Sequence, residues 1–287
     1  MCGLSIKAKA SGSWQVVKPW VKSGSSWIAV KVAWVKVAGN WKKSYEYEWN
    51  YTFPSGEFTD VDIDTLAGID KFNNVNITIP STTTLVGSST SAYALKTGSG
   101  FGGTLKIINN GKILGRGGNG GNGGTSGSNA NAGAAGTAGT SGGNAIYIES
   151  NVTIDNNGTI AAGGGGSGGG GSGGGRDSGF FGYSNYYAGG GGGGGAAPYG
   201  LGGSQGSGSE GRTGSAGSAA TISYAGGGGA GSCHQEGCGS AGRTGGIYNT
   251  NGTAASAGTG DFKSNGGGGG SAGSAYIYAD SFTVTQV

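Results

Sequence analysis

The sequence predicts an all-β and irregular fold, in which small antiparallel β domains at the N-terminus are followed by a bundle, or sandwich, of glycine-rich polyglycine-II helices with aromatic tip loops. Three observations predict it. Glycine recurs at every third position after residue 114, tryptophan and lysine are interspersed with valine before residue 50, and strand-like segments separate the glycine tracts. The glycine phasing decides the larger part of the architecture, and the other two patterns indicate β-strands.

The glycine phasing is strict over the first tract. Only Ala130 departs from a series at positions 115, 118, 121, 124, 127, 133, 136, 139 and 142. A polyproline-II-type helix repeats every three residues and has no internal hydrogen bonds, so its backbone groups need partners in neighbouring helices. A flexible linker has no reason to keep its glycines in step, and four prolines are too few for collagen. The pattern therefore predicts packed helices instead of disorder.

Composition changes sharply near Leu114. Of the 73 glycines in 287 residues, 61 lie between Gly115 and Gly273. We expect three parts: residues 1–50 as a Trp/Lys β-repeat segment, residues 51–114 as a β-rich connector, and residues 115–287 as a glycine-rich domain that ends in a β-strand.

The N-terminal segment contains a short repeat, WQVVKPWVKSGSSW followed by WIAVKVAWVKVAGNW, which predicts β-hairpins. Residues 1–43 carry eight lysines and no acidic residue. This charge favours a solvated sheet face over a nucleic-acid-binding arm. The tryptophans either form the core of a small sheet or dock onto another protein, and both readings stay open. The candidate docking residues are Trp14, Trp20, Trp27, Trp34 and Trp41.

Residues 44–108 continue as strands. The stretch FTDVDIDTLAGID begins like a calcium-binding loop, but Thr65 and Lys71 stand where an EF-hand needs glycine and glutamate. A half-exposed strand explains the alternation better. The segments TLKIINNGKILG, NVTIDNNGTIAAG and AYIYADSFTVTQV, the first two with Asn-Gly turn signals, are expected to pair in one small sheet at one end of the bundle.

The tract composition predicts about eight helical runs that reverse direction at each connection. This alternation places Tyr199 and the turn SCHQEGC at the sheet end. At the opposite tip it collects aromatic and apolar side chains among polar neighbours, a composition typical of an interaction surface. These candidate binding residues are Phe180, Phe181, Tyr183, Tyr186, Tyr187, Ile222, Tyr224, Tyr248 and Phe262.

Catalytic and metal chemistry finds little support. Cys233 and Cys238 form a disulfide or remain free thiols, and a metal site with His234 ranks below both because too few ligands are available. His234 is the only histidine, and no credible third member completes a triad with it. We expect no catalytic residue, no metal and no cofactor.

The motifs LKIINNGKILGRGGNGGNGG, GGGGSGGGGSGGG and GGGGGSAGSAYIY, with aromatic loops between the tracts, resemble the distal tail-fibre adhesins of T-even-like bacteriophages. The resemblance covers about residues 104–287. It implies a sandwich of polyglycine-II helices whose variable loops bind an outer-membrane protein or lipopolysaccharide of the host. The Trp/Lys segment departs from that family and looks more like the WVKxxGxW repeats of phage fibre and minor tail proteins.

The resemblance implies a non-enzymatic receptor-binding protein at the tip of a phage tail fibre, with residues 115–287 as its receptor-binding domain. Its partners would be a bacterial surface receptor and, through the N-terminal segment, another tail-fibre protein, without nucleic-acid binding. No signal peptide or membrane span is evident, which agrees with synthesis in the host cytoplasm and release by lysis. The alternatives are a structural segment of a trimeric fibre and an ice-binding polyglycine-II protein.

Overall fold

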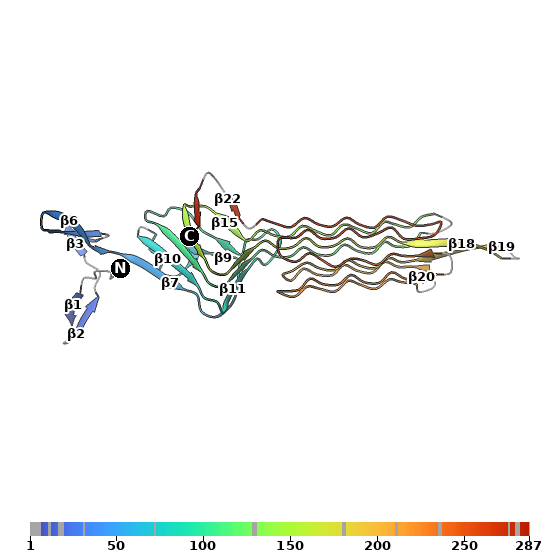
Figure 1. The fold of residues 1–287 in the computed structure, drawn as a ribbon, viewed down its shortest axis with the longest axis horizontal. Coiled ribbons are helices and arrows are strands. Elements are labelled where there is room, and N and C mark those ends of the chain that lie inside the picture. The colour runs from blue at the N-terminus through green and yellow to red at the C-terminus, as the bar shows by residue number, and fades with distance from the viewer. Residues whose placement is uncertain are drawn as a thin grey trace.

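The computed structural model describes residues 7–10, 13–16, 20–30, 32–71, 73–127, 131–179, 182–209, 212–234, 237–274, 276–278 and 282–286. The molecule is elongated and has three parts in a row (Figure 1). Hairpins at the N-terminus are followed by a β-solenoid, and a long bundle of extended glycine-rich runs leads away from the solenoid to a distal tip. The predicted all-β class is confirmed.

The N-terminal part consists of three antiparallel hairpins, each a separate two-stranded sheet. The turns of the second and third hairpins contain Gly24 and Gly39, which adopt the left-handed conformation that glycine tolerates best. The paired strands are β1 (Lys7–Ala10) with β2 (Ser13–Val16), β3 (Trp20–Ser23) with β4 (Ser26–Ala29), and β5 (Val32–Val37) with β6 (Asn40–Glu46).

The solenoid is built from three parallel sheets, and the chain moves from one sheet to the next at each corner. The first sheet holds β7 (Glu48–Thr52), β10 (Asn74–Ile79), β13 (Leu105–Asn109), β16 (Val152–Asn156) and β23 (Val284–Gln286). The second holds β8 (Gly56–Thr59), β11 (Thr83–Val86), β14 (Lys112–Leu114) and β17 (Thr159–Ala161). The third holds β9 (Val61–Asp62), β12 (Leu95–Lys96), β15 (Ile146–Ile148) and β22 (Tyr276–Tyr278).

Alternate residues of each strand form the solenoid core. In β10 the side chains of Val75, Ile77 and Ile79 are fully buried and point inward, with polar residues between them. In-register pairing stacks Ile77 on Ile107 of β13, and Ile107 on Ile154 of β16. The apolar side chains therefore run as columns along the solenoid axis.

The three β-like segments that flank the glycine tracts do pair, but in parallel and in more than one sheet. Asn110-Gly111 and Asn157-Gly158 lie at the corners between β13 and β14 and between β16 and β17, so neither dipeptide joins two strands of one sheet. Gly111 is required at its corner because a Cβ there would overlap the carbonyl oxygens of Thr83 and Pro80. The single small sheet predicted from sequence is corrected to successive rungs of a solenoid.

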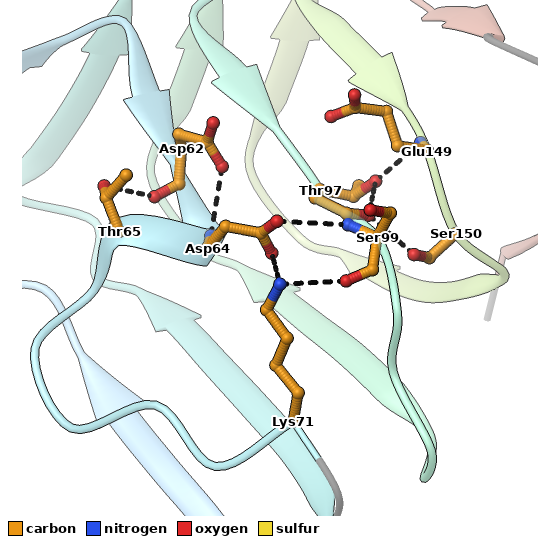
Figure 2. Close-up of polar contacts among 9 residues, drawn as sticks. Asp62, Asp64, Thr65, Lys71, Thr97, Ser99, Glu149 and Ser150 are labelled. Atoms are coloured by element: carbon orange, nitrogen blue, oxygen red, sulfur yellow. Dashed lines mark hydrogen bonds and ion pairs between the residues drawn. The ribbon is translucent and has the colours of Figure 1, made fainter.

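The Asp-rich segment forms a polar corner of the solenoid (Figure 2). Only Val61–Asp62 is strand, because Asp62 accepts a hydrogen bond from the Asp64 backbone and caps a short 3-10 helix, η1 (Ile63–Thr65). The Lys71 ammonium lies 2.7 Å from the Asp64 carboxylate and 2.9 Å from the carbonyl oxygen of Ser99. The predicted half-exposed strand is therefore too long, and these carboxylates stabilise the fold locally.

The glycine-rich runs are two insertions into the solenoid. Residues 115–145 leave the second sheet after β14 and return at β15, and residues 162–275 leave after β17 and return at β22. The described runs are residues 115–127, 132–144, 162–172, 189–196, 200–208, 213–220, 225–232, 239–246, 251–259 and 264–274.

Lateral backbone hydrogen bonds join these runs at every third residue, as a three-residue helical repeat requires. Between the first run and the third, Gly118, Gly121 and Gly124 donate to the carbonyl oxygens of Gly164, Ser167 and Gly170, all at 2.8–2.9 Å. The same spacing recurs throughout the bundle. The backbone groups that such a helix leaves open are satisfied by its neighbours.

Runs 162–172 and 189–196 lie at the centre of the bundle, and their glycine content shows why. Residues 162–172 are buried throughout and exchange hydrogen bonds with runs 115–127, 132–144, 189–196, 239–246, 251–259 and 264–274. All three faces of this helix meet another backbone, so its sequence is almost pure glycine. The peripheral run 132–144 meets neighbours on one side, and glycine is needed there only at every third position.

The described bundle contains more runs than the eight that the sequence predicts. Residues 200–217 are two antiparallel runs, because Gly217 donates to Gly203 and Gly214 donates to Gly206 across a reversal near Ser209. Residues 251–259 form a further run inside a segment predicted to be a connection. Each missed reversal changes the end of the bundle at which the following turns lie, with consequences for the candidate site.

Close helix packing predicts that alanine substitutions at two adjacent glycines of run 264–274 differ in their effect on stability. A Cβ at Gly267 would overlap the carbonyl oxygen of Thr137, whereas a Cβ at Gly268 meets nothing within 4 Å. Gly267→Ala should lower the free energy of unfolding by about 3 kcal/mol because the facing backbone cannot yield. Gly268→Ala is the matched control and should leave it nearly unchanged. Denaturant unfolding of both variants checks this, and equal stabilities would contradict the close packing.

Candidate functional site

The far end of the bundle carries the candidate site, here called the distal tip. It comprises the hairpin of β18 (Gly173–Gly179) and β19 (Gly182–Ala188), the residues Ser209 and Arg212, the hairpin of β20 (Cys233–His234) and β21 (Gly237–Cys238), and residues 260–263. The first hairpin extends beyond the ends of the runs (Figure 1). It continues the central glycine run, and in β18 the glycine sequence gives way to Arg176 and Asp177.

A disulfide closes the second hairpin of the distal tip. Cys233 and Cys238 lie opposite each other in the β20–β21 register, with 4.1 Å between their Cα atoms, and their sulfur atoms are bonded. Sequence reasoning left this disulfide open against free thiols and placed its turn at the sheet end. The placement is wrong, because the missed reversal near Ser209 moves β20 and β21 to the opposite end of the bundle.

Two aromatic contacts hold the distal tip together. The rings of Tyr186 and His234 are stacked almost parallel, with centroids 3.8 Å apart, and they join the two hairpins. The rings of Tyr187 and Phe262 lie 5.7 Å apart. Only 7% of Tyr187 and 9% of Phe262 is exposed, so this second pair forms a small apolar core under the surface.

Polar contacts connect the same segments. The Ser209 hydroxyl accepts a hydrogen bond from the Tyr187 backbone at 3.0 Å, and Arg212 donates to the carbonyl oxygen of Cys233 at 3.1 Å. Phe262 donates through its backbone to Gly174 at 2.9 Å. Segments that are far apart in the sequence are therefore fixed to one another, which gives the distal tip a defined shape.

The distal tip exposes charged and hydrogen-bonding groups around its aromatic contacts. The Arg176 guanidinium lies 5.9 Å from the centre of the Phe262 ring, and its Nε lies 3.4 Å from the Asn185 amide oxygen. Arg176, Arg212 and Lys263 are exposed. The sequence indicated Arg176 and Lys263 as polar neighbours of the predicted aromatic cluster, whereas it did not place His234 or Arg212 at the tip.

The structure brings together only part of the predicted binding set. Tyr186, Tyr187 and Phe262 lie at the distal tip, and Tyr187 and Phe262 are buried there. Tyr183 lies in β19, but its side chain is outside the described part of the structure. Phe180 and Phe181 lie outside the described residues.

Three predicted members lie at the opposite end of the bundle. Ile222 and Tyr248 pack against a buried cluster of solenoid residues, Val86, Leu114 and Ala161. Tyr224 is 76% exposed and closes the same turn as Ile222, because its carbonyl oxygen accepts a hydrogen bond from Thr221. Their predicted position at the tip is wrong, since the missed runs shift the order of the turns.

Tyr199 lies at this solenoid end, as the sequence predicts. Its hydroxyl lies 2.6 Å from the Glu57 carboxylate on β8, and the Arg116 guanidinium lies 5.2 Å from the centre of its ring. Burial and the hydrogen bond to Glu57 raise the pKa of Tyr199 to about 12. Together with Ile222 and Tyr248, Tyr199 forms the joint between bundle and solenoid.

The N-terminal tryptophans are largely exposed where their side chains are described. The exposed fractions are 54% for Trp20, 64% for Trp27, 55% for Trp34 and 65% for Trp41. The side chain of Trp14 is outside the described part of the structure. The sequence left open whether these tryptophans form the core of a small sheet or dock onto another protein. Because more than half of each of these four is exposed, they do not form a buried core.

Across the described residues, no group of three or more His, Cys, Asp or Glu side chains is arranged to hold a metal ion. No helix in the described part of the chain has the length and apolar character needed to cross a bilayer.

Comparison with known families decides the classification. The family model described as phage tail fibre adhesin Gp38 matches residues 48–287, well over half of the chain. The chain belongs to the phage tail fibre adhesin Gp38 family. The matched region of the adhesin begins at the first residue of β7, so the three hairpins lie outside it. The family is one of adhesins and virion components and is not an enzyme family.

A solved structure also resembles the adhesin. It is the crystal structure of the gp37-gp38 adhesin tip complex of the bacteriophage S16 long tail fiber, with 22% sequence identity and a TM-score of 0.46. The match covers 85% of the adhesin and 79% of the other chain. No curated protein sequence matches the adhesin significantly.

We expect the disulfide of the adhesin to stabilise the β20–β21 hairpin locally. Replacing both cysteines (Cys233→Ser with Cys238→Ser) should lower the stability of the β20–β21 hairpin by about 2 kcal/mol, because the closed loop is short. Hydrogen exchange should then become faster at the backbone amide of position 238, which bonds to the Thr259 hydroxyl in the wild type, and stay unchanged at the central Gly166. Equal acceleration at both amides would show that the disulfide supports the whole bundle.

The raised pKa of Tyr199 predicts that the adhesin loses stability in alkali. The phenol of Tyr199 ionises near pH 10 in the unfolded chain and near pH 12 in the folded one, so its contribution is fully present below pH 10 and declines between pH 10 and 12. Tyr199→Phe removes this contribution. The difference in unfolding free energy between wild type and variant should therefore shrink across that interval. Denaturant titrations at pH 9 and pH 12 measure it, and a constant difference would refute the assignment.

Proposed function

We propose that this protein is the terminal adhesin of a phage tail fibre and binds a receptor on the bacterial surface, an outer-membrane protein or lipopolysaccharide, through its distal tip. The observation that carries the proposal is the convergence of four chain segments, a disulfide and two aromatic contacts at the end farthest from the N-terminal hairpins. Membership of an adhesin family supports it.

The bundle acts as a rigid mount in this proposal. Its runs are polyglycine-II helices, and their lateral hydrogen bonds hold the distal tip in one arrangement before the receptor arrives. A preformed surface loses less conformational entropy on binding than a flexible loop does. The turns of the distal tip contribute little to the solenoid core, so their sequence can change without unfolding the protein.

The receptor contacts are assigned to the exposed part of the distal tip. Tyr186 and His234 present a stacked aromatic pair, with Arg176, Arg212 and Asn185 nearby. Aromatic and arginine side chains frequently dominate the binding energy of protein interfaces. Phe180, Phe181 and Tyr183 stay in the proposed contact set, whereas Tyr187 and Phe262 support it from beneath.

Attachment to the virion is assigned to the opposite end. The exposed tryptophans of the N-terminal hairpins lie there, outside the region matched by the family model. We propose that they contact another tail-fibre protein. The two functions are then separated along the molecule: the N-terminal end holds the fibre and the distal tip meets the cell.

The test is cell attachment by the purified, fluorescently labelled protein, using a bacterial strain that the wild type labels. Tyr186→Ala combined with His234→Ala should reduce labelling at least about tenfold, because an interface hot spot contributes about 2 kcal/mol or more. Tyr224→Ala is the matched control, since Tyr224 is an exposed aromatic at the other end of the bundle. It should label cells like the wild type.

Thermal unfolding of both variants serves as the folding control and should match the wild type. Undiminished labelling by the Tyr186→Ala, His234→Ala variant would exclude this surface as the receptor site. An equal loss in the Tyr224→Ala variant would place the receptor contacts elsewhere on the bundle.

A further inference from the structure

The three N-terminal hairpins share one design. In each, a lysine lies directly opposite a tryptophan in the strand register: Lys9 opposite Trp14, Lys22 opposite Trp27, and Lys36 opposite Trp41. The pair is the second one from the turn in each register, and the spacing within each pair is five residues. The chain therefore carries three copies of one sequence and register pattern.

A second tryptophan completes the same face in two of the hairpins. Because side chains alternate between the faces of a strand, Trp20 shares a face with Lys22, and Trp34 shares a face with Lys36. Between 54% and 65% of each of the four described tryptophans is exposed. We call this Trp-Lys-Trp surface the hairpin face.

The hairpin face combines aromatic area with positive charge. The Lys36 ammonium lies 6.0 Å from the centre of the Trp41 ring. Residues 1–46, which contain the three hairpins, hold eight lysines and a single acidic residue, Glu46 at the end of β6. Electrostatic complementarity across an interface then requires an acidic partner that also offers apolar area to the rings.

A second copy of this chain fits the hairpin face poorly. Six of the seven acidic residues in residues 44–71 already have partners. Among them, Glu57 binds Tyr199, Asp60 accepts from Ser88, and Asp64 pairs with Lys71. Removing them from these contacts would cost stability in the solenoid. The acidic partner is therefore a different molecule.

The hairpins also need support from outside. Each is an isolated two-stranded sheet, and none of the described strands β1–β6 pairs with the solenoid. A lone hairpin in water is marginally stable at best, and burial of its aromatic face against a protein surface would stabilise it.

Resting on the proposed function, we infer that the tail-fibre protein that carries this adhesin presents several equivalent acidic sites with apolar recesses, and that each hairpin face occupies one of them. The tryptophan rings fill the recesses and the lysines pair with surrounding carboxylates. Several weak, equivalent contacts joined in one chain hold the adhesin much more tightly than one contact does, because each bound hairpin raises the effective concentration of the next.

The experiment uses phage particles that lack the adhesin, mixed with purified full-length protein, with the bound adhesin quantified by mass spectrometry. Trp27→Ala and Trp41→Ala should each weaken binding several-fold, and the double variant should lose far more than either one. Lys22→Glu with Lys36→Glu keeps the aromatic area and should weaken binding at least tenfold. Val21→Ala with Val35→Ala is the matched control, because both valines lie on the side of the strands opposite the hairpin face, and this variant should bind like the wild type.

The outcomes separate this inference from the proposed function. Purified hairpin variants should still label cells, because their distal tip is intact. Normal binding of the double tryptophan or double lysine variant to the particles would overturn the inference, as would an equal loss in the valine control. Wild-type binding to alginate, lost in the same variants while particle binding is kept, would identify the ligand as an acidic polysaccharide and also overturn it.

Discussion

The glycine-rich part of this protein depends on one constraint: an extended helix without internal hydrogen bonds must place every backbone N–H and C=O group against another chain or water. Lateral bonds at every third residue satisfy the constraint, and they require backbones to lie closer than any side chain permits. Stability here comes from the number of neighbouring backbones and not from apolar side chains. Sequence composition follows directly, because a run surrounded on all sides is nearly pure glycine.

Much of this could be predicted from the sequence. The phase of Gly115 to Gly142 identifies close backbone approach, and a Cβ at Gly121 would indeed overlap Thr137. The reversal near Ser209 could not be found the same way, because Gly202, Gly208, Gly211, Gly214 and Gly217 stay in one three-residue frame through it. The signal that was available is charge, since Glu210 and Arg212 interrupt an otherwise neutral tract. A single missed reversal moved Tyr224 and Tyr248 to the wrong end.

The same limits apply to the candidate site and to the solenoid. Aromatic composition indicated an interaction surface, but it does not distinguish an exposed ring from one that packs under the surface, as Tyr187 and Phe262 do. The contact of His234 with Tyr186 depends on two runs lying side by side, which no local pattern encodes. Strand segments were recognised from alternation, whereas their parallel pairing follows from the corners, where Asn-Gly turns the chain into the next sheet.

The two insertions into the solenoid have a consequence for how such proteins diversify. Both ends of each insertion are fixed in one rung of the solenoid, at β14 and β15 for the first and at β17 and β22 for the second. A longer bundle would therefore need three extra residues in every run at once, or the lateral hydrogen bonds would fall out of register. Length is therefore locked, while the turns at the free end carry no such restriction. If the distal tip binds the receptor as proposed, exchange of whole turns would change the cell that is recognised and leave the length of the bundle constant.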